Sequence, residues 1–256
     1  MKTYRGYLID LDGTMYRGNA KIDSAVRFVN KLATLRIPYL FVTNNSSQTP
    51  EQVANKLTNF GAPAKPELVI TSSLATASYI RQKSQQASIY MIGETGLETA
   101  LKNQRLSLVD ERDVDYVVIG IDRKLSYEKL AKACLAIRSG ATFISTNADK
   151  AIPTERGLIP GNGALTAVIS ASTGVEPTFI GKPERIIIDQ ALERLQVDKH
   201  ETIMVGDNYE TDIRAGMNAG IDTMLVHTGV TNKSDLQHIT KTPTYTVDSL
   251  DDWKLP

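Results

Sequence analysis

The sequence predicts an α/β protein built on a mainly parallel sheet. The main support is that apolar segments typical of strands alternate with amphipathic segments typical of helices along nearly all of the 256 residues. A second observation is that several of the apolar segments end in a cluster of polar side chains. Ligands of open α/β sheets bind outside the carboxyl ends of the strands, so these clusters mark the expected functional edge.

The first third of the chain contains three strand–helix pairs. Residues 7–9 form an apolar segment that predicts a buried strand. Residues 24–35 predict a helix because Val26, Val29 and Leu32 recur at helical spacing, and Pro38 ends this segment. The remaining elements expected here are a strand over 39–43, a helix that begins at Pro50 after a Thr49 cap, a strand over 68–71 and a helix over 72–82.

A polar stretch near residues 83–87 indicates a boundary, and a middle block with its own strands and helices follows it. We expect strands over 88–92, 116–121 and 142–146, helices over 96–103, 127–138 and 162–172, and a long loop over 147–161. The last part predicts helices over 185–195 and 209–219 and strands over 202–205 and 223–227. We therefore expect a discontinuous core of residues 1–84 and 180–256, with a smaller α/β domain of residues 85–179 inserted into it.

Composition excludes several classes of protein. Lys+Arg and Asp+Glu both number 29, so no basic surplus favours a nucleic-acid partner. The single Cys134 excludes an internal disulfide and fits a reducing compartment, and it shares an apolar helical face, which predicts packing. No apolar run approaches the ~20 residues of a membrane span. We expect a cytoplasmic protein, monomeric or homodimeric, whose partner is a small molecule and neither a nucleic acid nor a membrane.

Two aspartates directly follow the first predicted strand. Asp10 and Asp12 are two residues apart, so in extended chain their side chains point the same way, and Gly13 permits a sharp turn after them. Two neighbouring carboxylates repel each other unless a cation or a shared proton lies between them. The alternative is a turn in which both aspartates only cap backbone amides. The full run Asp-Leu-Asp-Gly-Thr after an apolar strand favours a functional site.

Three further polar clusters are expected at the same sheet edge. They contain Thr43 with Asn44, Gly181 with Lys182, and Gly206-Asp207-Asn208. Together with the first pair they supply carboxylates, an ammonium group, a hydroxyl and turn amides. Mg²⁺ binds oxygen ligands, commonly a few carboxylates together with a substrate phosphate. This donor set therefore predicts a phosphate group held against Mg²⁺, with Lys182 balancing the remaining phosphate charge.

The order of these motifs resembles that of the haloacid dehalogenase-like phosphatases, and most closely their NagD-like, 4-nitrophenylphosphatase-like branch. The similarity rests on the Asp-Leu-Asp-Gly-Thr run, on Phe-Val-Thr-Asn-Asn-Ser around Thr43, on Lys182, and on Gly-Asp-Asn-Tyr-Glu-Thr-Asp, which ends at Asp212. Thr-Asn-Ala-Asp, which ends at Asp149, and Pro-Gly-Asn-Gly over 160–163 add to it. The resemblance covers essentially the whole chain and implies a Rossmann-like, doubly wound core with an inserted α/β cap over 85–179.

The resemblance also implies roles for individual residues. Asp10 would be the nucleophile that forms an aspartyl-phosphate, and Asp12 would protonate the leaving alkoxide and later activate water. The Mg²⁺ ligands would be Asp10, the Asp12 carbonyl and Asp207. The phosphate would be bound by Gly13, Thr43, Asn44, Asn45 and Lys182, with Asn208 and Asp212 as outer positioning groups.

The inserted block is expected to select the substrate. The cap of this branch would close over the site and exclude water. Its long loop contains Asn147, Asp149, Lys150 and Arg156, and the two cations could pair with a second anionic group such as a sugar-acid carboxylate. The alternative is a surface loop with no role in binding.

Several functions remain open at this level. The leading one is a Mg²⁺-dependent phosphatase of small phosphate monoesters, especially sugar or acid-sugar phosphates, through an aspartyl-phosphate. A nucleoside 5'-monophosphate phosphatase would use the same chemistry. A phosphomutase is disfavoured by the large insertion, and a dehalogenase by Asp12, because carbon–halogen cleavage needs no acid for an alkoxide. A non-catalytic phosphate-binding module would not need the full set of carboxylates.

Overall fold

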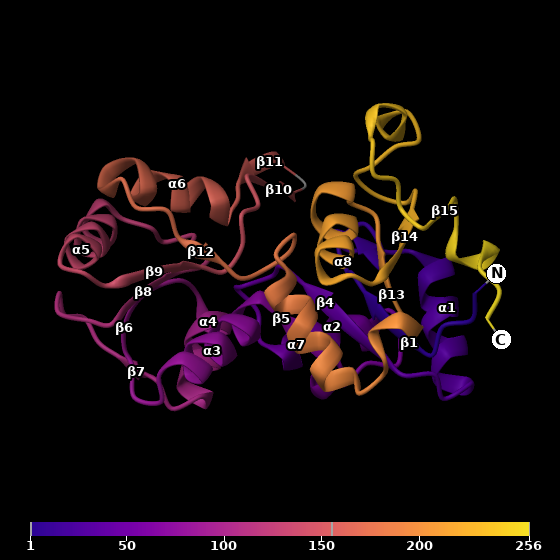
Figure 1. Ribbon diagram of the computed structural model, residues 1–256, viewed down its shortest axis with the longest axis horizontal. Helices are drawn as coiled ribbons and strands as arrows, with labels where there is room; N and C mark the ends of the chain where they lie inside the picture. The colour runs from indigo at the N-terminus through magenta and orange to yellow at the C-terminus, as the bar shows by residue number, and fades with distance from the viewer. Residues whose placement is uncertain (1, 155, 256) are drawn as a thin grey trace. The chain divides into compact units, whose positions relative to one another are not determined.

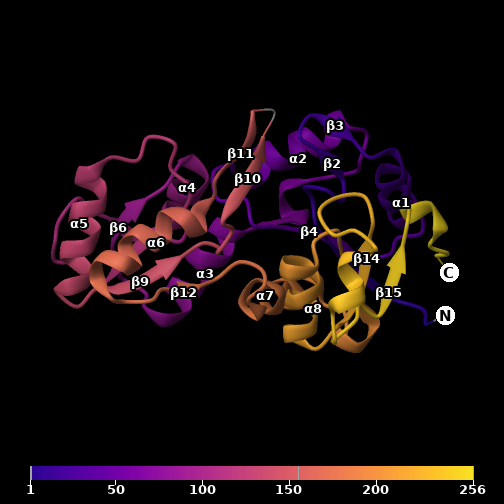
Figure 2. The ribbon, with the colours of Figure 1, turned by 90° about the horizontal axis from the view of Figure 1, so that it is seen from above.

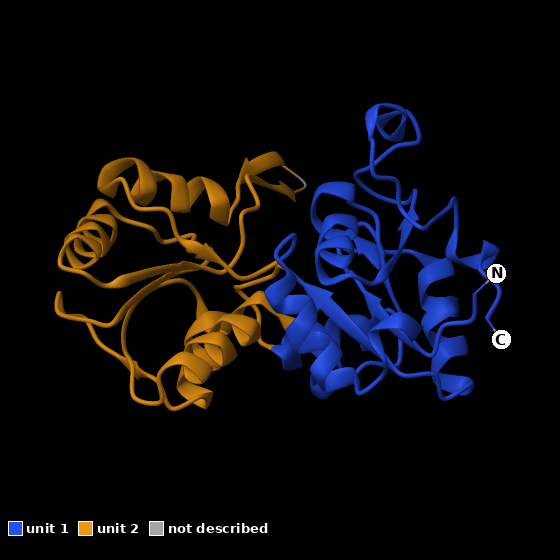
Figure 3. Ribbon diagram, in the orientation of Figure 1, with its two compact units in different colours: residues 1–43, 50–70, 182–256 blue, residues 44–49, 71–181 orange. Residues whose placement is uncertain are grey.

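The computed structural model describes residues 2–154 and 156–255, which separate into two compact units (Figure 3). Among these residues, unit 1 comprises 2–43, 50–70 and 182–255, and unit 2 comprises 44–49, 71–154 and 156–181. We expected residues 1–84 in the first unit. Instead, residues 44–49 and the helix over 72–83 cluster with unit 2, where that helix packs against the next one along the chain. Within the described residues, no helix has the length and apolar character needed to cross a bilayer.

Unit 1 is built on a six-stranded sheet in the order β15-β14-β13-β1-β4-β5. The pairings β1·β13, β1·β4, β13·β14 and β14·β15 are parallel, with Tyr7 opposite both Ile203 and Tyr39. The chain thus runs from β1 outward to β4 on one side and later returns to β13 on the other, the arrangement of a doubly wound sheet. The strands are β1 (Gly6–Ile9), β4 (Tyr39–Thr43), β5 (Val69–Thr71), β13 (Thr202–Gly206), β14 (Asp222–Val226) and β15 (Tyr245–Val247).

Helices cover the sheet of unit 1 (Figure 1). α1 (Asp23–Thr34) and α2 (Pro50–Asn59) pack their buried faces, including Phe28 and Leu57, on the sheet side that carries Ile9 and Phe41. Each such fully buried side chain contributes about 1.5–3 kcal/mol relative to an exposed one. The other helical elements are α7 (Arg185–Leu195), a π-helical turn (Tyr209–Ile213) that continues into α8 (Arg214–Ala219), and the short 3-10 turns η1 (Pro66–Leu68), η2 (Lys199–Glu201), η4 (Asp235–His238) and η5 (Leu250–Asp252).

Unit 2 contains a five-stranded sheet in the order β12-β9-β8-β6-β7, whose pairings are all parallel. Figure 1 shows α5 and α6 on one face of this sheet and α3 and α4 on the other. Cys134 on α5 is 7% exposed and lies in the core cluster between α5 and the sheet, so its predicted packing role is confirmed. The elements are β6 (Ser88–Ile92), β7 (Ser107–Leu108), β8 (Tyr116–Ile119), β9 (Thr142–Ser145), β12 (Thr178–Phe179), α3 (Ser72–Lys83), α4 (Thr95–Asn103), α5 (Tyr127–Arg138) and α6 (Asn162–Thr173).

Two short hairpins were not predicted. Within the expected long loop, β10 (Ala151–Thr154) and β11 (Gly157–Pro160) form an antiparallel ribbon, whose strands lie side by side in Figure 2. In unit 1, β2 (Tyr16–Arg17) and β3 (Ala20–Lys21) form a second ribbon just after the two aspartates. Both are short and have a glycine at or next to the turn, and apart from Tyr16 they are mostly exposed, so they lack the apolar alternation that makes a strand visible in sequence.

Candidate active site

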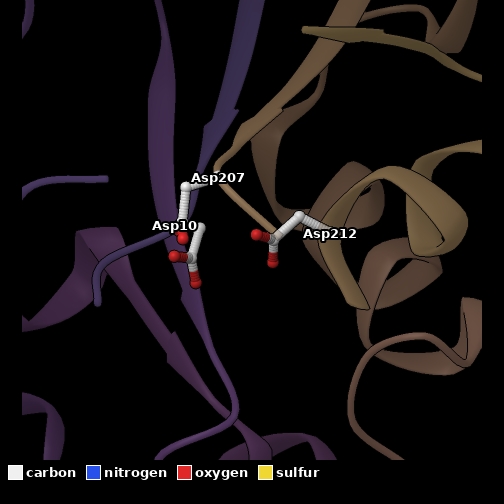
Figure 4. A group of neighbouring side chains, drawn as sticks. All are labelled: Asp10, Asp207 and Asp212. Carbon is white, nitrogen blue, oxygen red and sulfur yellow. The ribbon is translucent and has the colours of Figure 1, made fainter. Parts of the chain in front are cut away.

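The polar ends of β1, β4 and β13 meet at the centre of the unit 1 sheet. Asp10 directly follows β1, and its backbone amide donates to the carbonyl oxygen of Val205 in β13 at 2.9 Å. Thr43 is the last residue of β4, and Asp207 directly follows β13. Figure 4 shows the carboxylates of Asp10, Asp207 and Asp212 turned toward one another. One carboxylate oxygen of each lies within 4.8 Å of the others, and all three residues are buried.

Lys182 links two of these carboxylates. Its Nζ atom donates to Oδ1 of Asp10 at 2.5 Å, to Oδ1 of Asp212 at 2.7 Å and to the carbonyl oxygen of Val42 at 2.9 Å. Burial lowers the pKa of Lys182, but the charges of Asp10 and Asp212 outweigh this effect and raise it above its ordinary value. Lys182 is therefore charged, which leaves two excess negative charges if all three aspartates are ionised.

Asp207 is held by two hydrogen bonds from other segments of unit 1. Its Oδ1 accepts a bond from the Thr14 hydroxyl at 3.0 Å, and its Oδ2 accepts one from the Val230 amide at 2.7 Å. Burial and then the charge of Asp212 raise the pKa of Asp207 to about 6, against the lowering effect of these two donors. The pKa of Asp10 is also raised well above its usual range, first by burial and then by Asp212. Both shifts disfavour the ionised carboxylates, and a cation bound between them would favour the ionised forms.

Position 13 requires glycine both because a side chain would overlap a neighbour and because its backbone φ is positive. Its φ is +88°, and a Cβ atom at this position would lie 2.3 Å from Oδ2 of Asp207. Gly206 is similar, because a Cβ there would lie 2.3 Å from Cβ of Asp212. The Gly13 carbonyl accepts a hydrogen bond from the Thr228 hydroxyl at 2.7 Å. The two glycines thus allow backbone and carboxylates to approach more closely than any side chain would permit.

Asp12 is exposed to solvent, unlike the buried aspartates Asp10, Asp207 and Asp212. It pairs with the buried Tyr16 through an isolated β-bridge, and the Tyr16 side chain lowers the pKa of its carboxylate. Surrounding protein atoms raise its pKa, while the charges of Lys56 and Lys182 lower it. An accessible carboxylate with a raised pKa, next to a buried one, is suited to exchange a proton with a ligand.

Two predicted positioning residues have identifiable partners. Asp212 accepts from Lys182 through Oδ1 and from the backbone amide of Asn208 through Oδ2, at 3.0 Å. The side chain of Asn208 instead caps the π-helical turn, since its Oδ1 accepts from the Glu210 amide at 3.0 Å. Asn208 therefore contributes its backbone to the cluster, and its side chain shapes the turn that presents Asp212.

The predicted substrate residues of unit 2 form a separate network. Nδ2 of Asn44 donates to the Asp149 carboxylate at 3.1 Å, and Nδ2 of buried Asn147 donates to the Asn44 carbonyl at 2.9 Å. Oδ1 of Asn45 accepts from the amides of Ser47 and Gln48, so its side chain stabilises the turn before α2. Arg156 lies exposed at the tip of the β10–β11 ribbon, where its amide donates to the Thr154 hydroxyl.

The donor set of unit 1 fits a divalent cation. Three buried carboxylates approach within 4.8 Å, one ammonium group is present, and burial and then the charge of Asp212 raise the pKa values of Asp10 and Asp207. Buried carboxylates of this number are stable together only when a cation or protons neutralise them. Oxygen ligands alone favour Mg²⁺ or a similar hard cation.

The sequence reasoning missed four residues that shape this site. Thr14 and Val230 orient Asp207, while Tyr16 and Lys56 surround Asp12. Thr14 was visible in the motif as the residue after Gly13. Val230 and Lys56 had no local signal, because they reach the aspartates only through tertiary folding. Tyr16 lies four residues after Asp12, in the β2–β3 ribbon that was not predicted.

Comparison with known proteins identifies the family. Residues 7–107 match the model of the haloacid dehalogenase-like hydrolases, and residues 179–253 match a HAD-hydrolase-like model. The chain is 58% identical to the 5'-nucleotidase YutF of Bacillus subtilis, over 99% of this chain and 98% of that protein. It is 56% identical to an acid sugar phosphatase of Staphylococcus aureus, over 98% of this chain and 97% of that protein.

Solved structures agree with the sequence comparison. A thermostable NPPase double mutant from Geobacillus stearothermophilus superposes with a TM-score of 0.94 at 59% identity, covering 99% of both chains. NagD from E. coli superposes with a TM-score of 0.92 at 32% identity, again covering 99% of both chains. These similarities extend over both units. The chain therefore belongs to the haloacid dehalogenase-like hydrolases, in the branch that contains NagD and the p-nitrophenyl phosphatases.

Proposed function

We propose that this phosphoric monoester hydrolase acts on small sugar or acid-sugar phosphates through an aspartyl-phosphate on Asp10, with Mg²⁺ as its cofactor. The observation that carries the proposal is the position of Lys182, which holds Oδ1 of Asp10 at 2.5 Å. The bond fixes the Asp10 carboxylate and leaves Oδ2 to act as the nucleophile. The nucleotidase and the acid sugar phosphatase among the relatives support phosphate monoesters as the substrate class.

The first step would transfer the phosphoryl group to Asp10. The Oδ2–phosphorus bond forms as the bond between phosphorus and the leaving oxygen breaks, and Asp12 donates its proton to that oxygen. Thr43 at the end of β4 and the amides after it would bind the phosphoryl oxygens, and the Lys182 ammonium would offset their charge.

The second step would regenerate the enzyme. Asp12, now ionised, accepts a proton from water, whose oxygen attacks phosphorus while the phosphorus–Oδ2 bond breaks. Inorganic phosphate then leaves and Asp12 is again protonated. The exposed position of Asp12 suits this double role, since both the leaving group and water can reach it.

Mg²⁺ would be held by Asp10, Asp207 and the Asp12 carbonyl. When bound, it would neutralise charge on the transferred phosphoryl group. Asp212 lies close enough to contribute, and its Oδ1 accepts from the Lys182 ammonium while its Oδ2 accepts from the Asn208 amide. We therefore assign Asp212 to the positioning of Lys182.

Unit 2 is proposed as the cap domain that selects the substrate. The Asn44–Asp149 contact and the adjoining β10–β11 ribbon would carry this role, with Lys150 and Arg156 available to a second anionic group. If Arg156→Ala left kcat/KM unchanged on every carboxylated substrate, that assignment would be abandoned. We also propose a cytoplasmic location, in agreement with the single buried cysteine.

The decisive experiment is Asp10→Asn assayed with p-nitrophenyl phosphate and Mg²⁺. We expect hydrolysis to fall by at least about 10³-fold while the protein stays folded, because the amide cannot form the acyl phosphate. Asp113→Asn, an exposed aspartate of unit 2, is the control and should retain wild-type activity. Full activity of Asp10→Asn would exclude the covalent mechanism. A screen of phosphorylated sugars, sugar acids and nucleoside 5'-monophosphates would then separate the substrate classes.

A further inference from the structure

A hollow of about 460 Å³ lies on unit 1, between the β2–β3 ribbon and α2. Its volume falls within the range of small-molecule sites. Four of its six lining residues carry a primary amide, and the others are one lysine and one aromatic residue: Asn19, Gln52, Asn55, Lys56, Asn59 and Phe60. A primary amide both donates and accepts hydrogen bonds, as the hydroxyl groups of a sugar do.

Lys56 places a positive charge in this hollow. Its Nζ lies 3.7 Å from the centre of the Tyr16 ring and 6.0 Å from that of Phe60, so two aromatic rings fix its position. Among the described residues, Lys56 has no carboxylate within salt-bridge distance. Its side chain is half-buried, and burial lowers its pKa while the charge of Asp12 raises it. The ammonium group is thus oriented but not neutralised by an ion pair.

The hollow is linked to the reaction through one side chain. The ring of Tyr16 lies against Lys56, and Tyr16 pairs with Asp12 through an isolated β-bridge, where its side chain lowers the pKa of the Asp12 carboxylate. Under the proposed function, Asp12 protonates the oxygen of the leaving group. A group bound against Lys56 would therefore belong to the part of the substrate that leaves.

We propose that this hollow is a leaving-group subsite for a polyhydroxylated group that bears a carboxylate, with Lys56 as the residue that recognises the carboxylate. The amides of Asn55 and Asn59 would bind the hydroxyl groups, and Phe60 would contact the carbon skeleton. This inference rests on the proposed function and assigns part of the substrate specificity to the catalytic unit itself.

The test compares two substrates that differ in one group. Gluconate 6-phosphate carries a carboxylate where glucitol 6-phosphate carries a hydroxymethyl group. We expect the wild-type protein to favour gluconate 6-phosphate by about tenfold in kcat/KM, and Lys56→Met to lower this preference several-fold, mainly through KM. Disturbance of Tyr16 and Asp12 by the substitution would slow both substrates equally, so the ratio reports recognition of the carboxylate.

Three further variants make the result specific. Lys56→Arg keeps the charge and should restore much of the preference. Asn55→Ala, an exposed change that leaves Tyr16 covered, should lower kcat/KM for both sugar phosphates by a few fold. Lys65→Met removes an exposed lysine of the same unit outside the hollow and should preserve the wild-type ratio.

The outcomes separate this inference from the proposed function. If the wild-type protein hydrolyses p-nitrophenyl phosphate but neither sugar phosphate, or if the ratio is the same in Lys56→Met and the wild type, the subsite is excluded and the phosphatase proposal stands. The subsite is also excluded if Lys56→Met selectively lowers kcat/KM for adenosine 5'-monophosphate, which carries no carboxylate. Failure to hydrolyse any of these phosphates would reject the proposed function itself.

Discussion

Nζ of Lys182 lies 2.5 Å from Oδ1 of Asp10, and the two side chains are only 2% and 10% exposed. The same Nζ lies 2.7 Å from Oδ1 of Asp212. A buried ion pair of this kind is not a reliable source of stability, but removal of one partner leaves the other charge buried and uncompensated. Lys182 is therefore required both to keep Asp10 ionised and to hold it in one orientation.

Lys182→Met should inactivate the enzyme and destabilise it. Without the ammonium group, Asp10 and Asp212 face each other in a buried space, and we expect a loss of about 3 kcal/mol in the free energy of unfolding. Activity on p-nitrophenyl phosphate should fall by at least about 10³-fold. Urea unfolding and steady-state kinetics provide the two measurements. Activity within tenfold of the wild type would show that Lys182 is not needed to orient Asp10.

Gly13→Ala should disrupt the position of Asp207. The new Cβ would lie 2.3 Å from the Asp207 carboxylate at a backbone φ of +88°, so both steric overlap and conformational strain oppose it. We expect a loss of at least ~2 kcal/mol in stability together with weaker metal binding. Gly18→Ala is the matched control, since Gly18 also has a positive φ but no atom within 4 Å of the new Cβ. Gly18→Ala should lower the free energy of unfolding only through backbone strain, by about 1 kcal/mol. Equal effects of the two substitutions would contradict the importance of the close approach.

The alternation of apolar and amphipathic segments predicted a mainly parallel sheet, and the resemblance to the haloacid dehalogenase-like phosphatases implied its doubly wound order. The meeting of Asp10, Lys182 and Asp207 could be predicted because strand ends in a parallel sheet share one edge. The resemblance also implied that Asp212 is an outer positioning group, and in the structure Asp212 accepts a hydrogen bond from Lys182 at 2.7 Å. Asn208 was also expected to be an outer positioning group. In the structure its backbone amide donates to Asp212, while its side-chain Oδ1 caps the turn before α8. A π-helical turn replaces the first turn of the expected helix over 209–219, and apolar periodicity does not distinguish the two forms.

The parts that could not be predicted depend on contacts between distant segments. The amide of Val230 donates to Asp207 from a loop 23 residues later in the chain. Lys56, on helix α2, contacts the ring of Tyr16 in strand β2. No local pattern of hydrophobic residues encodes such contacts. The unit boundary near residue 71 was missed for the same reason, since α3 follows a unit 1 strand without a linker yet packs against α4.

The metal-free protein should lose stability as the pH rises through about 6. Burial and the charge of Asp212 raise the pKa of Asp207 from 3.8 to about 6, so the folded protein binds a proton more tightly than the unfolded chain. Protonated Asp207 therefore favours folding at low pH, and this contribution is lost above the folded pKa. Melting in EDTA should show a loss of about 1.4 kcal/mol between about pH 5 and 7.5, which added Mg²⁺ restores. In Asp207→Asn both the pH dependence and the Mg²⁺ effect should be reduced, and an unchanged metal titration would remove Asp207 from the metal site.

Asn162→Ala should destabilise unit 2 at the base of the β10–β11 ribbon. Nδ2 of Asn162, which is 2% exposed, donates to the Ser145 hydroxyl and the Asn147 carbonyl, both at 2.9 Å. Its loss leaves buried acceptors without this donor, so we expect a cost of about 2 kcal/mol and faster amide hydrogen exchange in residues 147–161. Ser170→Ala is the control on the same helix, because the Ser170 hydroxyl is buried without a hydrogen-bond partner among the described residues and should cost almost nothing to remove. Since Asn147 also donates to the Asn44 carbonyl, Asn162→Ala should alter relative kcat/KM values among sugar phosphates more than the hydrolysis of p-nitrophenyl phosphate. A uniform loss of activity on all substrates would argue against a role of this network in specificity.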